Sequence, residues 1–237
     1  MIETATGVVL RTRRLTETSL IIHWITPGLG RLATVAKGAL RPKSAFRGKL
    51  DLFYRADFSF SRSRRSDLHN LREVSLRETY PVLRQDLDCL RHASYCAALV
   101  EQASETETPL PAVFGLIASL LQYLGAHGPR AQAIFAFELK LLSELGLQPD
   151  LEQSRLHPGT KLLVQALTEK DWSVLARLNP SDAQVAELRQ FLQGFFIYHL
   201  GRIPRGRDTA LAPAHRRSVS KPDGACSGHN PYPQTPA

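Results

Sequence analysis

The sequence lacks the features of a membrane-spanning, secreted or disulfide-rich protein. It contains no run of about eighteen or more apolar residues, and its start, MIETATGVVL, has neither the basic end nor the long apolar segment of a secretory signal. Its three cysteines form no Cys-x-x-Cys pair, which fits a reducing compartment. Cys89 and Cys96 lie on one predicted helix face, where we expect buried thiols. We therefore expect a soluble cytoplasmic protein with no membrane contact.

Motifs of common enzyme classes are also missing. No glycine-lysine phosphate loop occurs, because Lys37-Gly38 has the reverse order, and neither His-Glu-x-x-His nor Gly-x-Ser-x-Gly is present. Carboxylates are sparse in the first 80 residues, whereas a nuclease would need clustered acids to hold metal ions. His23 is interpreted as a packed or edge residue rather than a base, and we expect no metal site at Cys226 and His229. The sequence predicts a protein that is not an enzyme.

Positive charge is concentrated at the start of the chain. Residues 1–80 hold 15 Lys and Arg against 7 Asp and Glu, residues 81–203 hold 10 against 13, and residues 204–237 hold 5 against 2. A basic segment beside a mildly acidic one is typical of a protein in which one module contacts a polyanion and the other does not. The charge pattern therefore predicts two domains.

Apolar residues alternate in short runs over residues 1–80, which predicts strands. The alternation is strict from Leu50 to Phe60, where every second residue is apolar. Turn-forming residues separate the runs, for example Thr26-Pro27-Gly28 and the polar stretch 61–66. Five strands in about 80 residues suit a closed barrel of the OB type, because so few strands avoid open edges only by closing.

From residue 81 onward the apolar spacing becomes helical. Helices are expected around residues 83–101, 116–124, 131–145 and 181–201, with Ser181 as an N-cap. Residues 81–203 therefore form a predicted helical bundle, and the fold class is α+β with two domains. Residues 204–237 are rich in proline and poor in apolar residues, so burial cannot offset the entropy of ordering them and we expect a disordered tail.

A loop of the predicted barrel carries the most concentrated positive charge. It joins the third strand to the strand starting at Lys49, and its cations have no acid among them. Phe46 lies within this loop, and Phe53 and Arg55 are expected to face outward from the next strand. Bases stack on such rings for roughly 1–3 kcal/mol each while cations follow the phosphates. The candidate nucleic-acid site comprises Arg11, Arg13, Lys37, Arg41, Lys43, Phe46, Arg47, Lys49, Phe53, Arg55, Arg62, Arg64 and Arg65.

Other interpretations of the same charges remain open. The basic barrel surface could be only a solvated or membrane-surface patch, with the acidic helical domain acting as a protein-binding adaptor. Phe53 could then pack under the helical domain instead of facing outward. An OB surface of this kind could also bind RNA rather than DNA. Five further cations in the last segment could extend a nucleic-acid path; they are Arg205, Arg207, Arg216, Arg217 and Lys221.

Several motifs in order resemble the RecO family of recombination mediators. Within residues 7–60 they are Glu-Thr-Ser at 17–19, Thr-Pro with glycines at 26–30, Ala-Lys-Gly-Ala at 36–39, and Lys-Ser followed by Gly-Lys-Leu between 43 and 50. A second match is FELKLLSELGLQPDL at 137–151. The resemblance covers about residues 1–203 and leaves out the segment from 204 onward.

The resemblance implies a DNA repair and recombination protein without catalytic activity, cytoplasmic and associated with the nucleoid. It implies binding of single- and double-stranded DNA, annealing of complementary strands, and work with RecR and single-strand binding protein to load RecA. The basic barrel surface of the family carries over to the positions inside the matching motifs, which are Arg11, Arg13, Lys37, Arg41, Lys43, Arg47 and Lys49. Arg62, Arg64 and Arg65 are included on charge alone.

Two departures from the family pattern change what is expected. Some relatives hold zinc on cysteines just after the Pro-Asp-Leu motif, but the stretch here, EQSRLHPGTK at 152–161, offers only His157, so we predict no zinc and no other cofactor. Many relatives have a basic residue just before Phe-Glu-Leu, on a surface implicated in holding the tail of single-strand binding protein. Here that place is Phe135-Ala136, and Arg130 and Lys140 are the candidate substitutes.

Overall fold

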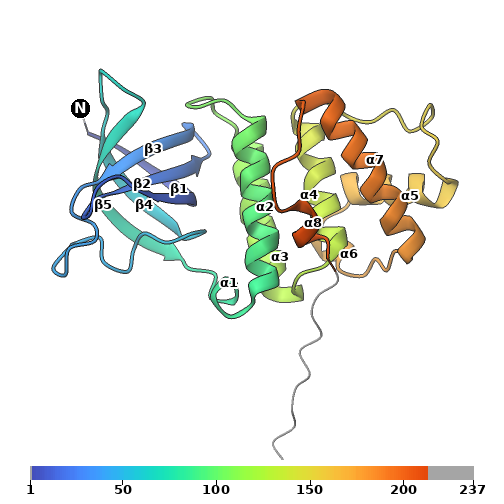
Figure 1. The fold of residues 1–237 in the computed structure, drawn as a ribbon, viewed down its shortest axis with the longest axis horizontal. Helices are drawn as coiled ribbons and strands as arrows, with labels where there is room; N and C mark the ends of the chain where they lie inside the picture. Colours follow the sequence, from blue (N-terminus) through green and yellow to red (C-terminus); the bar gives the residue numbers. More distant parts are fainter. Residues whose placement is uncertain (1, 213–237) are drawn as a thin grey trace, which may run out of the picture.

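A closed barrel of five strands forms the first part of the chain. The computed structural model describes residues 2–212 and shows the barrel on one side and helices on the other (Figure 1). The strands are β1 (Ile2–Arg14), β2 (Leu20–Thr26), β3 (Gly30–Ala36), β4 (Arg55–Ser61) and β5 (Leu68–Glu78). Their order around the barrel is β1-β2-β3-β5-β4, and β3 and β5 form the one parallel pair. The predicted five-stranded barrel is confirmed.

Inward-facing aromatic side chains fill the barrel. Trp24 and Phe58 stack with ring centroids 4.1 Å apart, and Phe60 lies next to Phe58. The indole N–H of Trp24 donates a hydrogen bond to Thr34 Oγ1 over 2.8 Å, which satisfies a polar group that is fully buried. Small barrels are filled by alternating side chains in this way, so the period of two in the sequence determines which residues form the core.

The strand expected from residue 50 is shorter than the alternation predicts. β4 begins at Arg55, and residues 50–54 form an irregular segment before it. Ala56 and Phe58 are buried as expected, but Phe53 is only 1% exposed and has a positive φ of 63°. Its ring joins the apolar core that contains the helices. The exposed position predicted for Phe53 is wrong and the alternative, packing under the helical domain, is correct, because this contact overrides the local alternation.

Eight helices follow the barrel within the described residues. They are α1 (Val82–Gln85), α2 (Leu87–Ala103), α3 (Pro111–His127), α4 (Ala131–Glu144), α5 (Pro158–Glu169), α6 (Trp172–Leu175), α7 (Asp182–Leu200) and α8 (Arg207–Ala210). Asp86 caps α2 by accepting from two backbone N–H groups, and Ser181 caps α7 in a capping box, as predicted. The cysteines of α2 are buried free thiols, also as predicted. No helix in the described part of the chain is long and apolar enough to span a membrane.

The segment that follows α7 packs against the helical domain. Arg207 is 4% exposed and forms a bidentate pair with the fully buried Glu138, at 2.7 Å for Nε–Oε1 and 3.0 Å for Nη2–Oε2. Tyr95 donates its hydroxyl to the same carboxylate. The predicted tail boundary at 204 is therefore wrong over residues 204–212, because composition does not reveal a buried acid that lies far away in the sequence. Residues 213–237, including Arg216, Arg217, Lys221 and the Cys226-His229 pair, lie outside the described residues.

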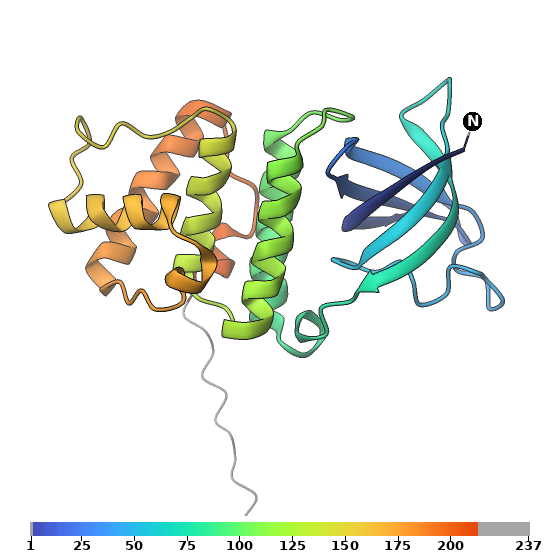
Figure 2. The ribbon, with the colours of Figure 1, turned by 180° about the vertical axis from the view of Figure 1, so that it is seen from behind.

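The helices α2 and α3 form the layer nearest to the barrel, as both views show (Figures 1 and 2). Barrel residues such as Val8, Leu10 and Ile25 belong to the same apolar core as these helices, while the barrel interior forms a second core. The contact between the two parts is therefore continuous and apolar.

The α2–α3 connection, residues 104–110, closes onto the barrel. Glu107 N donates to Arg31 O over 2.7 Å, and an Arg31 side-chain N–H donates to Ser104 O. Gly30 has a φ of 65°, and a Cβ at this position would lie 1.9 Å from Thr108 O. Only glycine fits here, because backbone fills the space that a side chain would need. We call these contacts, together with the ion pairs of Arg11 and Arg62 described below, the junction.

Candidate nucleic-acid interface

The connection between β3 and β4 holds the concentrated cations on an ordered backbone. We call residues 37–50 the basic loop. Successive tight turns build it, with backbone hydrogen bonds from Arg41 to Gly38, from Ser44 to Arg41 and from Arg47 to Ser44. Leu40 N also donates to Thr18 O over 3.0 Å, which joins the loop to the β1–β2 turn. The backbone is therefore pre-organised, so binding a ligand here costs less conformational entropy.

The cations of the basic loop form no ion pairs within the described residues. Lys37, Arg41, Lys43 and Arg47 are exposed, and Lys49 is half-buried. None of these five side chains forms an ion pair with any residue in 2–212. Several positive charges that form no ion pair create a local potential that attracts polyanions. The structure thus brings together the five loop cations that the sequence predicted.

Two further arginines border this group on β1. Arg13 is exposed and pairs in register with Ile21, which pairs with Val35. It therefore lies two strands away from the chain that leads into Lys37, roughly 10 Å across the sheet. Arg14, at the end of β1, is also exposed and was missed. The run Arg13-Arg14 was the signal that could have found it.

The ring of Phe46 is less exposed than the sequence predicts. It is half-buried and packs against the barrel core, and it lines two hollows on the surface. One hollow, of about 400 Å³, is also lined by the cations Lys49 and Arg72 and by the acids Asp57 and Glu73. Arg72 is exposed on β5 and was missed, because no sequence pattern links β5 to the loop.

Arg11 and Arg55 face the helices rather than the basic loop. Arg11 Nε lies 3.4 Å from Glu101 Oε1, and the guanidinium of Arg55 lies 5.7 Å from the ring centre of Phe114. With the buried Phe53, these two residues belong to the contact with the helical domain. Their assignment to one surface with the loop cations stays a prediction, and α2 and α3 supply partners that strand alternation does not predict.

His23, next to Arg11, is half-buried as predicted. Burial lowers the pKa of His23 to about 4, and the nearby Arg11 and Arg31 add to this effect. Its imidazole is therefore neutral at physiological pH and adds no charge to the surface.

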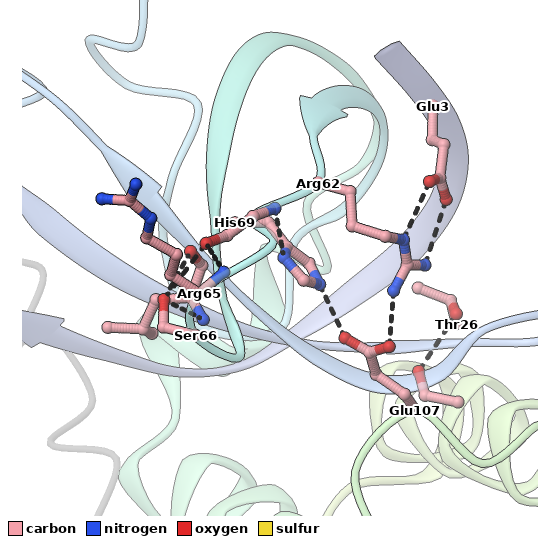
Figure 3. A network of polar contacts seen from close by, with 10 residues as sticks. Glu3, Thr26, Arg62, Arg65, Ser66, His69 and Glu107 are labelled. Carbon is pink, nitrogen blue, oxygen red and sulfur yellow. Dashed lines mark hydrogen bonds and ion pairs between the residues drawn. The ribbon is translucent and has the colours of Figure 1, made fainter. Parts of the chain in front are cut away.

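Arg62 belongs to a compensated network at the β4–β5 turn (Figure 3). Its Nε lies 2.8 Å from Glu3 Oε1, and Nη1 pairs with Glu107 of the α2–α3 connection. His69 Nδ1 accepts from Ser63 N, so its Nε2 carries the proton that is donated to Glu107 over 2.6 Å. These carboxylates raise the pKa of Arg62 and neutralise its charge by ion pairing within the molecule.

Arg64 and Arg65 are exposed in the same turn, at the far end of β4 from the basic loop. Figures 1 and 2 both show the turn and the loop on opposite sides of the barrel. The cations predicted as one surface therefore form two separate groups, and only the basic loop gathers many of them.

The two candidate partner-binding residues contact backbone carbonyls. Lys140 Nζ donates to Thr168 O and Lys170 O over 2.8 and 2.9 Å at the end of α5, and burial lowers its pKa. Arg130 is exposed and donates to Ala176 O over 3.2 Å. A hollow of about 230 Å³ borders Lys140 and Glu144. Their role in partner binding stays a prediction.

Residues 2–212 contain no cluster of three or more His, Cys, Asp or Glu side chains that could hold a metal. The backbone N–H of His157 donates to Glu187 over 2.9 Å. The absence of zinc and of other cofactors stays a prediction.

The chain is similar over most of its length to one family of proteins. The family model described as "Recombination protein O N terminal" matches residues 1–80, and "Recombination protein O C terminal" matches 84–155. DNA repair protein RecO of Moorella thermoacetica is 27% identical over 263 residues, covering 93% of this chain and 97% of the relative. RecO of Exiguobacterium sibiricum is 34% identical over 151 residues, but this match covers only 64% of this chain and 60% of that relative.

Proposed function

Because the chain belongs to the RecO family, we propose that it acts in DNA repair by binding single- and double-stranded DNA through the basic loop. It anneals complementary strands and, with RecR, helps to load RecA onto strands coated with single-strand binding protein. It works in the cytoplasm on the nucleoid and makes or breaks no covalent bond. The observation that supports DNA binding is the group of five loop cations without acid partners in the described residues.

Charge neutralisation explains how such a surface favours annealing. Two complementary strands repel each other through their phosphates, and cations that contact phosphates release the counterions condensed on them. Holding both strands on one protein also raises their local concentration. The protein then needs only to bind and release, and the bases supply the energy of pairing.

The helical domain is the proposed site for protein partners. Residues 81–203 carry 10 basic against 13 acidic residues, so this part does not compete for the same polyanion. Arg130 and Lys140 remain the candidates for contact with the tail of single-strand binding protein.

A salt titration of fluorescent single-stranded DNA tests the proposal. The variant carries alanine at Lys37, Arg41, Lys43 and Arg47. Each phosphate contact contributes about −0.7 to the slope of log affinity against log salt for single strands, so we expect the slope to shrink by about 2–3.

The matched control removes four arginines that already pair with acids, namely Arg62, Arg77, Arg91 and Arg189. It has the same net charge as the loop variant and should keep a nearly unchanged slope. Equal losses in both variants would mean that net charge alone governs binding, and an unchanged loop variant would locate the DNA site elsewhere. Competition with RNA of the same sequence separates DNA binding from RNA binding, because only RNA offers 2′-hydroxyl groups.

A further inference from the structure

A second hollow lies within the basic loop itself. It measures about 380 Å³ and is bounded by the start of β2 and by the loop. Its lining includes Leu20, Leu40, Arg41, Phe46, Arg47 and Leu50. Most of the lining side chains are thus apolar, and the charged ones are the two arginines.

The walls are positioned by contacts outside the hollow. Phe46 packs against the barrel core and Leu50 does the same, so neither is free to collapse into the space. Arg47 Nη1 donates to Pro42 O over 3.2 Å, which holds the guanidinium at the edge. Leu40 is 41% exposed, so an occupant would remove apolar surface from water.

An occupant of this hollow must combine an apolar body with negative charge at its ends. An unpaired nucleobase has this chemistry, because its planar faces are apolar and the phosphates on either side carry charge. The other loop cations, Lys37, Lys43 and Lys49, lie in the same short segment. A ligand with evenly repeated negative charges therefore fits these cations better than a ligand with a single acidic group.

We propose that this hollow captures one base of a single strand against Phe46, with Arg41 and Arg47 contacting the adjacent phosphates. The inference rests on the proposed DNA binding. Bases in a duplex are stacked and paired and cannot enter, so the cations alone would hold double-stranded DNA. The hollow thus gives the loop a preference for single strands, and a captured base must leave it before it pairs with a complementary strand.

The test compares Phe46→Leu, which keeps an apolar side chain against the core, with Phe46→Tyr, which keeps the ring face. The probes are a short fluorescent oligothymidylate, the same strand with abasic residues, and a duplex of equal length. We expect Phe46→Leu to weaken oligothymidylate binding by about five- to tenfold with an unchanged salt slope. Phe46→Tyr should bind like the wild type, and the abasic strand and the duplex should not distinguish the three proteins.

Contrary results are equally specific. If Phe46→Leu binds oligothymidylate like the wild type while the four-alanine loop variant does not, base capture is wrong and the proposed DNA binding stands. If the four-alanine loop variant also binds oligothymidylate normally, both base capture and the proposed DNA binding are wrong. Equal loss on abasic and normal strands would mean that Phe46 only supports the fold, which thermal unfolding of each variant would show. An acidic peptide with a terminal phenylalanine that binds in a Phe46-dependent way, with DNA binding unaffected, would assign the hollow to a protein partner instead.

Discussion

The basic loop and the junction both contain several cations, but in opposite settings. At the junction, Arg11 faces Glu101, Arg31 donates to Ser104 O, and Arg62 lies between Glu3 and Glu107. In the loop, no cation has an acid partner within residues 2–212. The acids of the junction come largely from α2 and from the connection after it. Whether an arginine is available to a ligand is therefore decided by distant parts of the chain.

Pairing with an acid affects whether an arginine can contact a ligand more than it affects the stability of the fold. Exposed ion pairs contribute roughly 0–1 kcal/mol, because both charges are already well solvated in the unfolded chain. A buried pair differs, since removal of one partner leaves the other charge without water or counter-charge. In this molecule the Arg207–Glu138 pair is the buried case, and the cations of the basic loop are the exposed case.

The largest expected effect comes from Arg207→Met. It would leave Glu138 buried without its counter-charge, so we expect the free energy of unfolding to fall by about 3–5 kcal/mol, as measured by urea denaturation. The control is Arg205→Met, because Arg205 is exposed and should change stability by less than about 0.5 kcal/mol. Wild-type stability in the Arg207 variant would show that the segment after α7 does not anchor the domain.

A smaller effect is expected from Gly30→Ala at the junction. The new Cβ meets Thr108 O, and φ lies in the left-handed region, so we expect a loss of about 2–3 kcal/mol in unfolding free energy. Gly28→Ala is the matched control, since Gly28 has no neighbour within 4 Å of a Cβ. If both variants unfold alike in a thermal scan, the α2–α3 connection does not pack on Gly30 in solution.

The smallest effect concerns the pH dependence of the Arg62 network. Hydrogen bonds from Arg62 lower the pKa of Glu3; burial raises the pKa of Glu107, but His69 and Arg62 outweigh this and lower it. A lowered folded pKa stabilises the protein above the ordinary carboxyl value of 4.5, and the gain is lost as pH falls through the folded pKa.

Arg62→Gln should therefore lower unfolding free energy by about 0.5 kcal/mol at pH 7, and the difference from wild type should vanish at low pH. The measurement is urea denaturation at several pH values. A difference that persists at low pH would show that Arg62 acts through packing rather than charge.

Local patterns were sufficient where contacts are local. The period of two predicted the buried faces of the strands, including Ala56, Phe58 and Phe60, and Ser181 was recognised as a cap because capping involves residues three apart. The same reasoning failed at Phe53 and Arg207. Both residues are buried by partners that lie far away in the sequence, and no local spacing encodes these contacts.

The sequence alone determined the barrel, the helical domain, the family and the position of the five loop cations, because strand alternation, helical spacing and charge density are all properties of short segments. Only the tertiary structure decided which cations form ion pairs, because acids from α2 and from the α2–α3 connection pair with Arg11 and Arg62, whereas no acid within residues 2–212 pairs with a cation of the basic loop. It also decided that Phe46 borders a hollow, and that of the two positions open to Phe53 the buried one against the helices is correct. Coulomb attraction and burial act between residues that folding brings together, irrespective of their separation along the chain.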